Sequence, residues 1–138
     1  MSARPTVLIV DDYQDAVDVW ELYLRASGFE VLTAPDGPTA ITVAMTRLPD
    51  LVVLDLELPG RSGIEVSAVL RAQESTRHIP LIAATGYSHI KQLDLARKSG
   101  FDAIVLKPCE PGVLVAEIRR LLAFTTEQQA ALDGQEST

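Results

Sequence analysis

Acidic side chains end two short apolar runs of the chain. Asp11 and Asp12 directly follow the apolar residues 7–10, and Asp55 follows the apolar residues 51–54. Uninterrupted apolar runs of this length are typical of strands buried on both faces, as in parallel sheets covered by helices. The carboxyl ends of such strands form the ligand crevice of an open sheet. If the two strands are neighbours, three carboxylates share one pocket, and like charges that close together need a cation.

Strand and helix patterns alternate five times along the chain. Strands are predicted at residues 6–10, 30–34, 51–54, 80–84 and 102–106, and helices at 13–27, 37–48, 64–72, 88–98 and 111–124. Within the second helix, the buried side is predicted to carry Ile41, Ala44, Met45 and Leu48. Five such units predict a doubly wound α/β parallel sheet, because right-handed crossovers place helices on both faces. Residues 1–124 are expected to form one domain, and the polar residues 125–138 a frayed C-terminal tail.

Composition limits the classes of function. The chain has 138 residues, of which 47% are apolar and 22% charged, as in one ordinary soluble domain. Its net charge of −7 and the lack of a basic cluster argue against direct binding of nucleic acid. Neither a signal segment nor a membrane-spanning apolar run is visible, so a cytoplasmic protein without membrane contact is expected. The single cysteine, Cys109, excludes an internal disulfide.

Five motifs lie at or just beyond the ends of the predicted strands. They are Asp11-Asp12, Asp55, Leu58-Pro59-Gly60, Ala84-Thr85-Gly86 and Lys107-Pro108. Together they resemble the CheY-like receiver domain of two-component response regulators, over about residues 6–124. The resemblance implies the flavodoxin-like strand order 2-1-3-4-5, which places the first and third strands side by side.

The resemblance also implies a phosphorylation chemistry. Asp55 matches the aspartate nucleophile that takes a phosphoryl group from a phosphohistidine. Asp12 would bind Mg²⁺ directly and Asp11 through water, and the backbone carbonyl of Glu57 would complete the protein's share of the ligands. The chain would then act only on its own phosphoryl group, by self-phosphorylation and autodephosphorylation, and would not be an enzyme.

Further residues match the phosphoryl-binding positions of the family. Lys107 and the Thr85 hydroxyl would each reach a phosphoryl oxygen, and a cis bond to Pro108 would turn the lysine into the pocket. The backbone N–H donors implied by the resemblance are those of Leu56, Glu57 and Gly86.

The implied switch departs from the family pattern at one position. Many receivers carry an aromatic residue three positions before the strand-five lysine, whereas this chain has Ile104. Activation is therefore expected to pass mainly from Thr85 through the following loop and the fourth helix. Tyr87 is a candidate shield of the acyl phosphate against water, or else a surface aromatic.

The expected partners follow from the same resemblance. The phosphodonor would be a sensor histidine kinase or a histidine phosphotransfer protein. A downstream protein would bind the face formed by the fourth helix, fifth strand and fifth helix, at residues 88–124. The start at Met1 and the polar end favour a stand-alone receiver. A receiver cut from a larger regulator or hybrid kinase, and a binding module that works without phosphorylation, stay open as alternatives.

Two other classes share parts of this pattern. A flavin-binding electron carrier has the same architecture, but it needs a phosphate loop rich in Gly, Ser and Thr where this chain has Asp11 and Asp12. A phosphatase of the haloacid dehalogenase type also uses an aspartate nucleophile with Mg²⁺. That family places the nucleophile on its first strand and carries a cap, and this chain shows neither feature.

Overall fold

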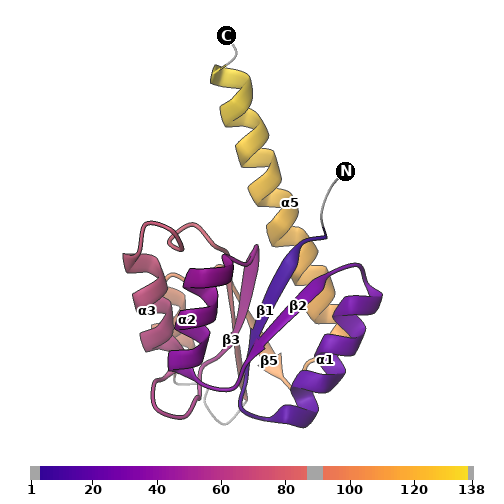
Figure 1. Cartoon of the computed structure of the whole chain (residues 1–138), viewed down its shortest axis with the longest axis vertical. Helices are drawn as coiled ribbons and strands as arrows, with labels where there is room; N and C mark the ends of the chain where they lie inside the picture. Colours follow the sequence, from indigo (N-terminus) through magenta and orange to yellow (C-terminus); the bar gives the residue numbers. More distant parts are fainter. Residues whose placement is uncertain (1–3, 87–91, 137–138) are drawn as a thin grey trace.

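A five-stranded parallel sheet with the order β2-β1-β3-β4-β5 forms the centre of the molecule, and helices cover both of its faces (Figure 1). The computed structural model describes residues 4–86 and 92–136. The strands are β1 (Thr6–Val10), β2 (Glu30–Ala34), β3 (Leu51–Asp55), β4 (Leu81–Gly86) and β5 (Ala103–Lys107). The helices are α1 (Gln14–Ala26), α2 (Gly37–Arg47), α3 (Gly63–Ala72), α4 (Gln92–Lys98) and α5 (Pro111–Glu136). The predicted α/β class and strand order are confirmed.

The central strands are buried on both sides, as their uninterrupted apolar runs predicted. In β1, Val7 and Ile9 pack with α1 and α5, whereas Leu8 and Val10 pack with α2 and α3. Successive side chains of a strand point to opposite faces, so each face of β1 needs apolar residues. Burial of one such side chain stabilises the fold by about 2 kcal/mol.

Strand pairing brings the acidic strand ends together. β1 pairs in parallel with β3, and Val10 lies opposite Leu54 in the register. Asp11 follows Val10 and Asp55 follows Leu54, so both carboxylates leave the sheet at the same level. On the other side of β3, Asp55 lies opposite Ala84, which directly precedes Thr85 of β4. The sheet therefore gathers the motifs of three strands at one edge.

Helix α5 is longer than predicted. Its backbone is helical as far as Glu136 and extends well beyond the sheet (Figure 1). The backbone of residues 125–136 is thus helical where a frayed tail was expected, and the division into a domain at residues 1–124 and a polar tail stays a prediction. The stretch of residues 127–132 consists of the good helix formers Glu, Gln, Ala and Leu, and residues 125–136 contain no proline, so a helix can continue there without an apolar face.

The buried side of α2 also differs from the prediction. Ala40 and Ala44 are fully buried, whereas Met45 and Leu48 are 40% and 52% exposed. Leu48 caps the end of the helix in the left-handed conformation, with φ of 48°, and so leaves the helical stripe. Small alanine side chains let α2 approach the sheet closely, and the larger residues then lie at the rim.

The predicted start of the fourth helix, at Ser88, lies outside the described residues. The described part of α4 begins at Gln92. Over the parts of the chain that the structure describes, no helix combines the length and apolar character needed to span a bilayer.

The loop between β3 and α3 is fixed by a close approach of Gly63 to the strand end. The Gly63 N–H donates to the Leu56 carbonyl at 3.0 Å. A Cβ at Gly63 would lie 2.3 Å from the Asp55 carbonyl oxygen, which no real side chain tolerates. Ser62 caps α3 by accepting from the Glu65 N–H at 3.2 Å. Gly63 thus lets the first turn of α3 pack directly against Asp55.

Gly63→Ala is expected to destabilise the fold by about 3 kcal/mol, because the added methyl group must push the Asp55 backbone aside. Gly60→Ala is the matched control. Gly60 has φ of +82° and open space around a Cβ, so only the left-handed backbone cost of about 1 kcal/mol applies. Urea unfolding measures both. Equal losses in the free energy of unfolding for the two variants would contradict the conclusion that Gly63 is needed for its close approach to Asp55.

Candidate functional site

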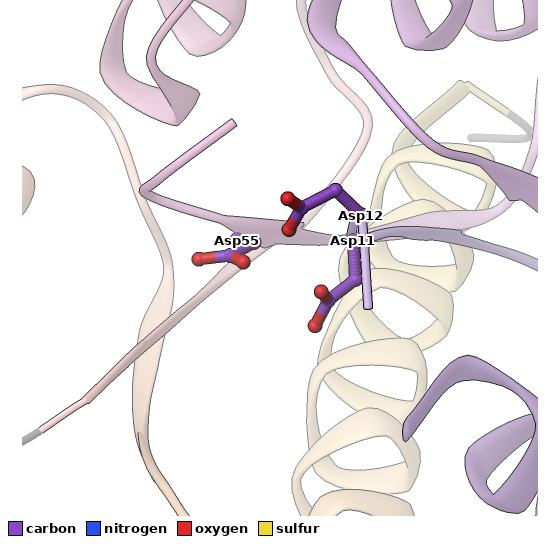
Figure 2. A group of neighbouring side chains, drawn as sticks. All are labelled: Asp11, Asp12 and Asp55. Carbon is purple, nitrogen blue, oxygen red and sulfur yellow. The ribbon is translucent and has the colours of Figure 1, made fainter. Parts of the chain in front are cut away.

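Three carboxylates form an acidic cluster at the carboxyl end of the sheet. One ligand oxygen from each of Asp11, Asp12 and Asp55 lies within 4.8 Å of the others, and the side chains converge (Figure 2). Asp11 and Asp55 are buried, at 4% and 8% exposure, whereas Asp12 is exposed. The sequence-predicted acids are therefore brought together, with one of them open to solvent.

Backbone donors orient the two buried carboxylates. Asp11 Oδ1 accepts from the Tyr13 N–H at 2.9 Å, and Asp55 Oδ1 accepts from the Glu57 N–H at 3.0 Å. Each bond joins a carboxylate to the N–H two residues later, which is the local turn that aspartate favours. One oxygen of each carboxylate is thus held by its own loop, and Oδ2 points to other partners.

Lys107 supplies the positive charge of the site. Its Nζ lies 2.5 Å from Asp11 Oδ2 and 3.1 Å from Asp55 Oδ2. The Lys107–Pro108 peptide bond is cis, as expected. β5 runs beside β4, with Lys107 opposite Gly86, so the lysine leaves the sheet at the same edge as the acids. One ammonium group therefore partly neutralises a cluster of three carboxylates.

The electrostatic balance leaves Asp55 harder to ionise than an ordinary aspartate. Burial raises the pKa of Asp55, and the negative charge of Asp11 adds to this effect. The Glu57 N–H and Lys107 act in the opposite direction without cancelling it. Burial works against the charge on Lys107, yet the hydrogen bond to Asp11 and the nearby carboxylates raise the pKa of Lys107. The lysine thus stays charged, and the site has an excess of negative charge.

Without Mg²⁺, Asp55→Asn is expected to stabilise the fold at neutral pH by about 1 kcal/mol, because it removes a like-charge contact at nearly constant volume. The pKa of Asp55 is higher folded than unfolded. Ionisation of Asp55 therefore lowers the free energy of unfolding at pH values above the pKa that Asp55 has in the folded state. This destabilisation disappears once the pH falls below the pKa of Asp55 in the unfolded state. The difference in the free energy of unfolding between variant and wild type, measured with urea, should accordingly shrink as the pH is lowered. A difference that widens in acid would contradict the raised pKa.

Thr85, next to the residue that pairs with Asp55, carries a buried hydroxyl without a hydrogen-bond partner in the described part of the chain. Its side chain is 1% exposed, and Oγ1 has no hydrogen-bond partner among the residues that the structure describes. A buried hydroxyl without a partner costs about 1–3 kcal/mol. An oxygen-rich ligand beside Asp55 would satisfy it. The sequence predicted this residue, but its burial is visible only in the folded chain.

The predicted backbone donors differ in their present partners. The Leu56 N–H donates to the Ala84 carbonyl at 3.0 Å and so is taken up in the pairing of β3 with β4. The Glu57 N–H is held by the Asp55 side chain itself. Gly86 ends β4 beside Thr85. Of the three, the Glu57 N–H is the one seen to donate to the Asp55 carboxylate.

An open cavity beside the acidic cluster gives access to Asp55. Its lining comes from one residue after β1, from the end of β3 and from the loop that follows β3: Asp12, Asp55, Leu56, Glu57, Leu58, Pro59 and Ser62. The Leu58-Pro59-Gly60 motif of the sequence thus borders the site, and Ser62 is an additional lining residue that the motif did not include. Asp55 therefore lines a cavity that opens to solvent.

The expected switch residues are only partly described. Tyr87 lies outside the described residues. Ile104 is half-buried and packs against the cluster of Leu56, Ala83 and Ala96, which joins the residue after β3 to β4 and α4. Phe101 packs against the same cluster, a contact that no local sequence pattern indicated.

The fold is a doubly wound α/β domain. An acidic cluster, a lysine and a buried hydroxyl lie at the carboxyl edge of its sheet, and such a set of groups suits the binding of a phosphoryl group. The family model for the response regulator receiver domain matches residues 7–119. The chain therefore belongs to the response regulator receiver family, and its role is to accept a phosphoryl group in two-component signalling. Receivers of this family generally depend on Mg²⁺, are not classical enzymes, and interact with histidine kinases and downstream effectors.

Curated relatives are longer proteins. The DNA-binding response regulator MtrA of Mycolicibacterium smegmatis is 36% identical over 129 residues, which cover 94% of this chain and 55% of MtrA. The response regulator PleD of Caulobacter vibrioides is 38% identical over 124 residues, which cover 90% of this chain and 27% of PleD. The chain thus spans about half of the first relative and about a quarter of the second.

Solved structures agree with the fold. A putative response regulator from Chloroflexus aurantiacus matches with a TM-score of 0.83 and 32% identity, covering 87% of this chain and 98% of that one. The chemotaxis response regulator CheY4 of Vibrio cholerae matches with a TM-score of 0.80 and 26% identity, covering 85% and 98%.

Proposed function

We propose that this chain accepts a phosphoryl group on Asp55, from the phosphohistidine of a sensor histidine kinase or a histidine phosphotransfer protein. The observation that carries the proposal is the acidic cluster, whose three ligand oxygens lie within 4.8 Å of one another beside Lys107. Asp55 is its central member, since its Oδ1 is held by the Glu57 N–H and its Oδ2 by Lys107.

The donor set fits Mg²⁺, which prefers a few carboxylates and keeps several waters. Asp12 and Asp55 would bind the ion directly, the Glu57 backbone carbonyl would be the third direct protein ligand, and Asp11 would act through a bound water. When bound, Mg²⁺ neutralises charge on the phosphoryl oxygens and the carboxylates. The burial of Asp11 and Asp55 supports this assignment, because an excess of negative charge that is shielded from water needs a cation nearby.

Phosphotransfer then needs positioning more than covalent help. A carboxylate oxygen of Asp55 attacks phosphorus, the P–N bond to the donor imidazole breaks, and its electron pair returns to the imidazole nitrogen. Lys107, now 3.1 Å from Asp55 Oδ2, passes to a phosphoryl oxygen. The unpartnered Thr85 hydroxyl donates to another. Later hydrolysis of the acyl phosphate by water restores Asp55, which is the only chemistry proposed for the chain.

Intact-mass measurement tests this function. The purified chain is incubated with acetyl phosphate, with Mg²⁺ or with a chelator in its place. One phosphoryl group per chain is expected with Mg²⁺, and hydroxylamine should remove it because acyl phosphates react with that nucleophile. A chain that stays unlabelled under the Mg²⁺ condition would refute the proposal.

The output surface is proposed on the face of α4, β5 and α5. A groove between β5 and α5 is lined by the apolar residues Ile104, Leu106 and Val113 and by the acidic residues Glu110 and Glu117. It suits contact with another protein. We propose no direct nucleic-acid contact for this domain, in view of its net charge of −7, and a cytoplasmic location. DNA binding is named for MtrA and is not carried over to this chain.

Phosphorylation is expected to act mainly through Thr85 and α4. Ile104 is a β-branched aliphatic side chain with few rotamers, so it can report activation only by small changes in packing. NMR spectra with Mg²⁺, with and without beryllofluoride as a phosphoryl mimic, should show large shifts from Thr85 to Lys98 and smaller ones at Ile104. Dominant shifts at Ile104 and α5, with Thr85 unchanged, would contradict this route.

Tyr87 stays a proposed shield of the acyl phosphate, with a plain surface aromatic as the alternative. Tyr87→Ala would speed phosphate loss if the ring blocks water. Unchanged hydrolysis would favour the surface reading.

A further inference from the structure

The Lys107 ammonium has a third neighbour besides its two carboxylates. Nζ lies over the indole ring of Trp20, 6.0 Å from the ring centroid. Trp20 is on α1, far from the lysine in sequence, and only 6% of its surface is exposed. The Lys107 side chain itself is 26% exposed, so much of the cation's surroundings is protein.

The carboxylates and the ring hold the lysine in different ways. Asp11 and Asp55 attract it by charge, but they are also the proposed ligands of Mg²⁺. A divalent ion at these oxygens competes with the ammonium for them. An indole face attracts an ammonium through its quadrupole and offers no ligand atom to Mg²⁺. The Trp20 contact therefore survives when the carboxylates are engaged elsewhere.

Packing keeps the ring in place. Trp20 belongs to the core cluster between the sheet and helices α1 and α5, together with Val17, Leu24, Val105 and Leu114. Cys109, two residues after the lysine, packs against the same cluster. Interiors packed at this density leave a large aromatic side chain little freedom to move. The ring is therefore a fixed support, whereas the lysine stem is flexible.

We propose that Trp20 is a positioning residue that keeps the Lys107 ammonium at the acidic cluster while it passes from carboxylate to phosphoryl oxygen. This positioning role rests on the proposed phosphorylation of Asp55, whereas the contact between the Lys107 ammonium and the Trp20 ring does not depend on it. A ring that merely fills the core is the competing explanation. Phe29 serves as the matched control, because it is a 4% exposed aromatic of the same cluster whose ring neighbours Arg119.

Fluorescence tests the contact without any phosphorylation. Trp20 is the only tryptophan of the chain, so its emission reports this site alone. Without Mg²⁺, Lys107→Met should change the emission intensity or wavelength, because a cation over the ring is lost. Lys98→Met, which removes a charge from exposed α4, should leave it unchanged. Identical spectra for wild type and Lys107→Met would overturn the proposal.

Phosphorylation rates test the positioning role. At saturating Mg²⁺ and acetyl phosphate, Trp20→Leu should slow labelling by about fivefold, and Trp20→Phe by less, since a weaker ring is kept. Phe29→Leu should lose similar stability with an unchanged rate. In a Lys107→Met background, Trp20→Leu should have no further effect, because the two residues act as one unit.

Two kinetic outcomes would overturn the role. One is a loss of labelling rate in Phe29→Leu equal to that in Trp20→Leu. The other is a full fivefold effect of Trp20→Leu in the Lys107→Met background. A wild-type chain that takes no label would refute the proposed function instead, and the fluorescence comparison then decides the contact alone.

Discussion

Asp55→Asn is expected to take no phosphoryl group from acetyl phosphate in the presence of Mg²⁺, with labelling below about 1% of the wild-type level. An amide oxygen is a poor nucleophile and cannot form the acyl phosphate. The fold should stay intact, because the substitution keeps the volume of a buried side chain and removes one charge of the acidic cluster. Intact mass gives the labelled fraction, and circular dichroism checks the fold.

Asp94→Asn is the matched control for this variant. Asp94 lies on α4, its side chain is 85% exposed, and it forms an ion pair with Arg97 at 3.6 Å. The same chemical change there should leave labelling at the wild-type rate. Stoichiometric labelling of Asp55→Asn at that rate would mean that another group is the acceptor.

Asp12→Ala is expected to weaken Mg²⁺ binding by about tenfold or more, because a direct carboxylate ligand is lost from a small set. Asp12 is the exposed member of the acidic cluster, so its truncation leaves no cavity in the core. Calorimetry or Trp20 fluorescence measures the affinity. Phosphorylation at low Mg²⁺ should fall in parallel.

The control for Asp12→Ala is Asp15→Ala, which changes the net charge equally. Asp15 is exposed in the first turn of α1 and lies outside the acidic cluster. Its loss should reduce Mg²⁺ affinity far less. Equal affinities for wild type and Asp12→Ala would count against the ligand role of Asp12.

The sheet could be predicted because its signal is local. The runs before Asp11 and Asp55 have no polar interruption, and such strands are buried on both faces. The strand-end motifs then indicated which side chains share an edge, and the structure brings Asp11, Asp55 and Lys107 within hydrogen-bonding distance.

Features that depend on packing between elements could not be predicted in the same way. Leu48 continues the apolar stripe of α2 in sequence, but its left-handed backbone turns it outward. The hidden hydroxyl of Thr85 and the Trp20 contact of Lys107 arise only when separate elements meet. The length of α5 was missed for the opposite reason, since local propensity alone extends it beyond its packed face.

The expectation of a stand-alone receiver stays a prediction. The matched relatives MtrA and PleD extend well beyond the region shared with this chain.

Residue-level location of the phosphoryl group tests the central claim most directly. The labelled chain is reduced with borohydride, which converts an aspartyl phosphate to homoserine and so marks the modified position permanently. Peptide mass spectrometry then locates the change. Homoserine at position 55, formed only when Mg²⁺ is present during labelling, is the predicted result. Homoserine at position 11 or 12, with Asp55 unmodified, would contradict the assignment of Asp55 as the acceptor.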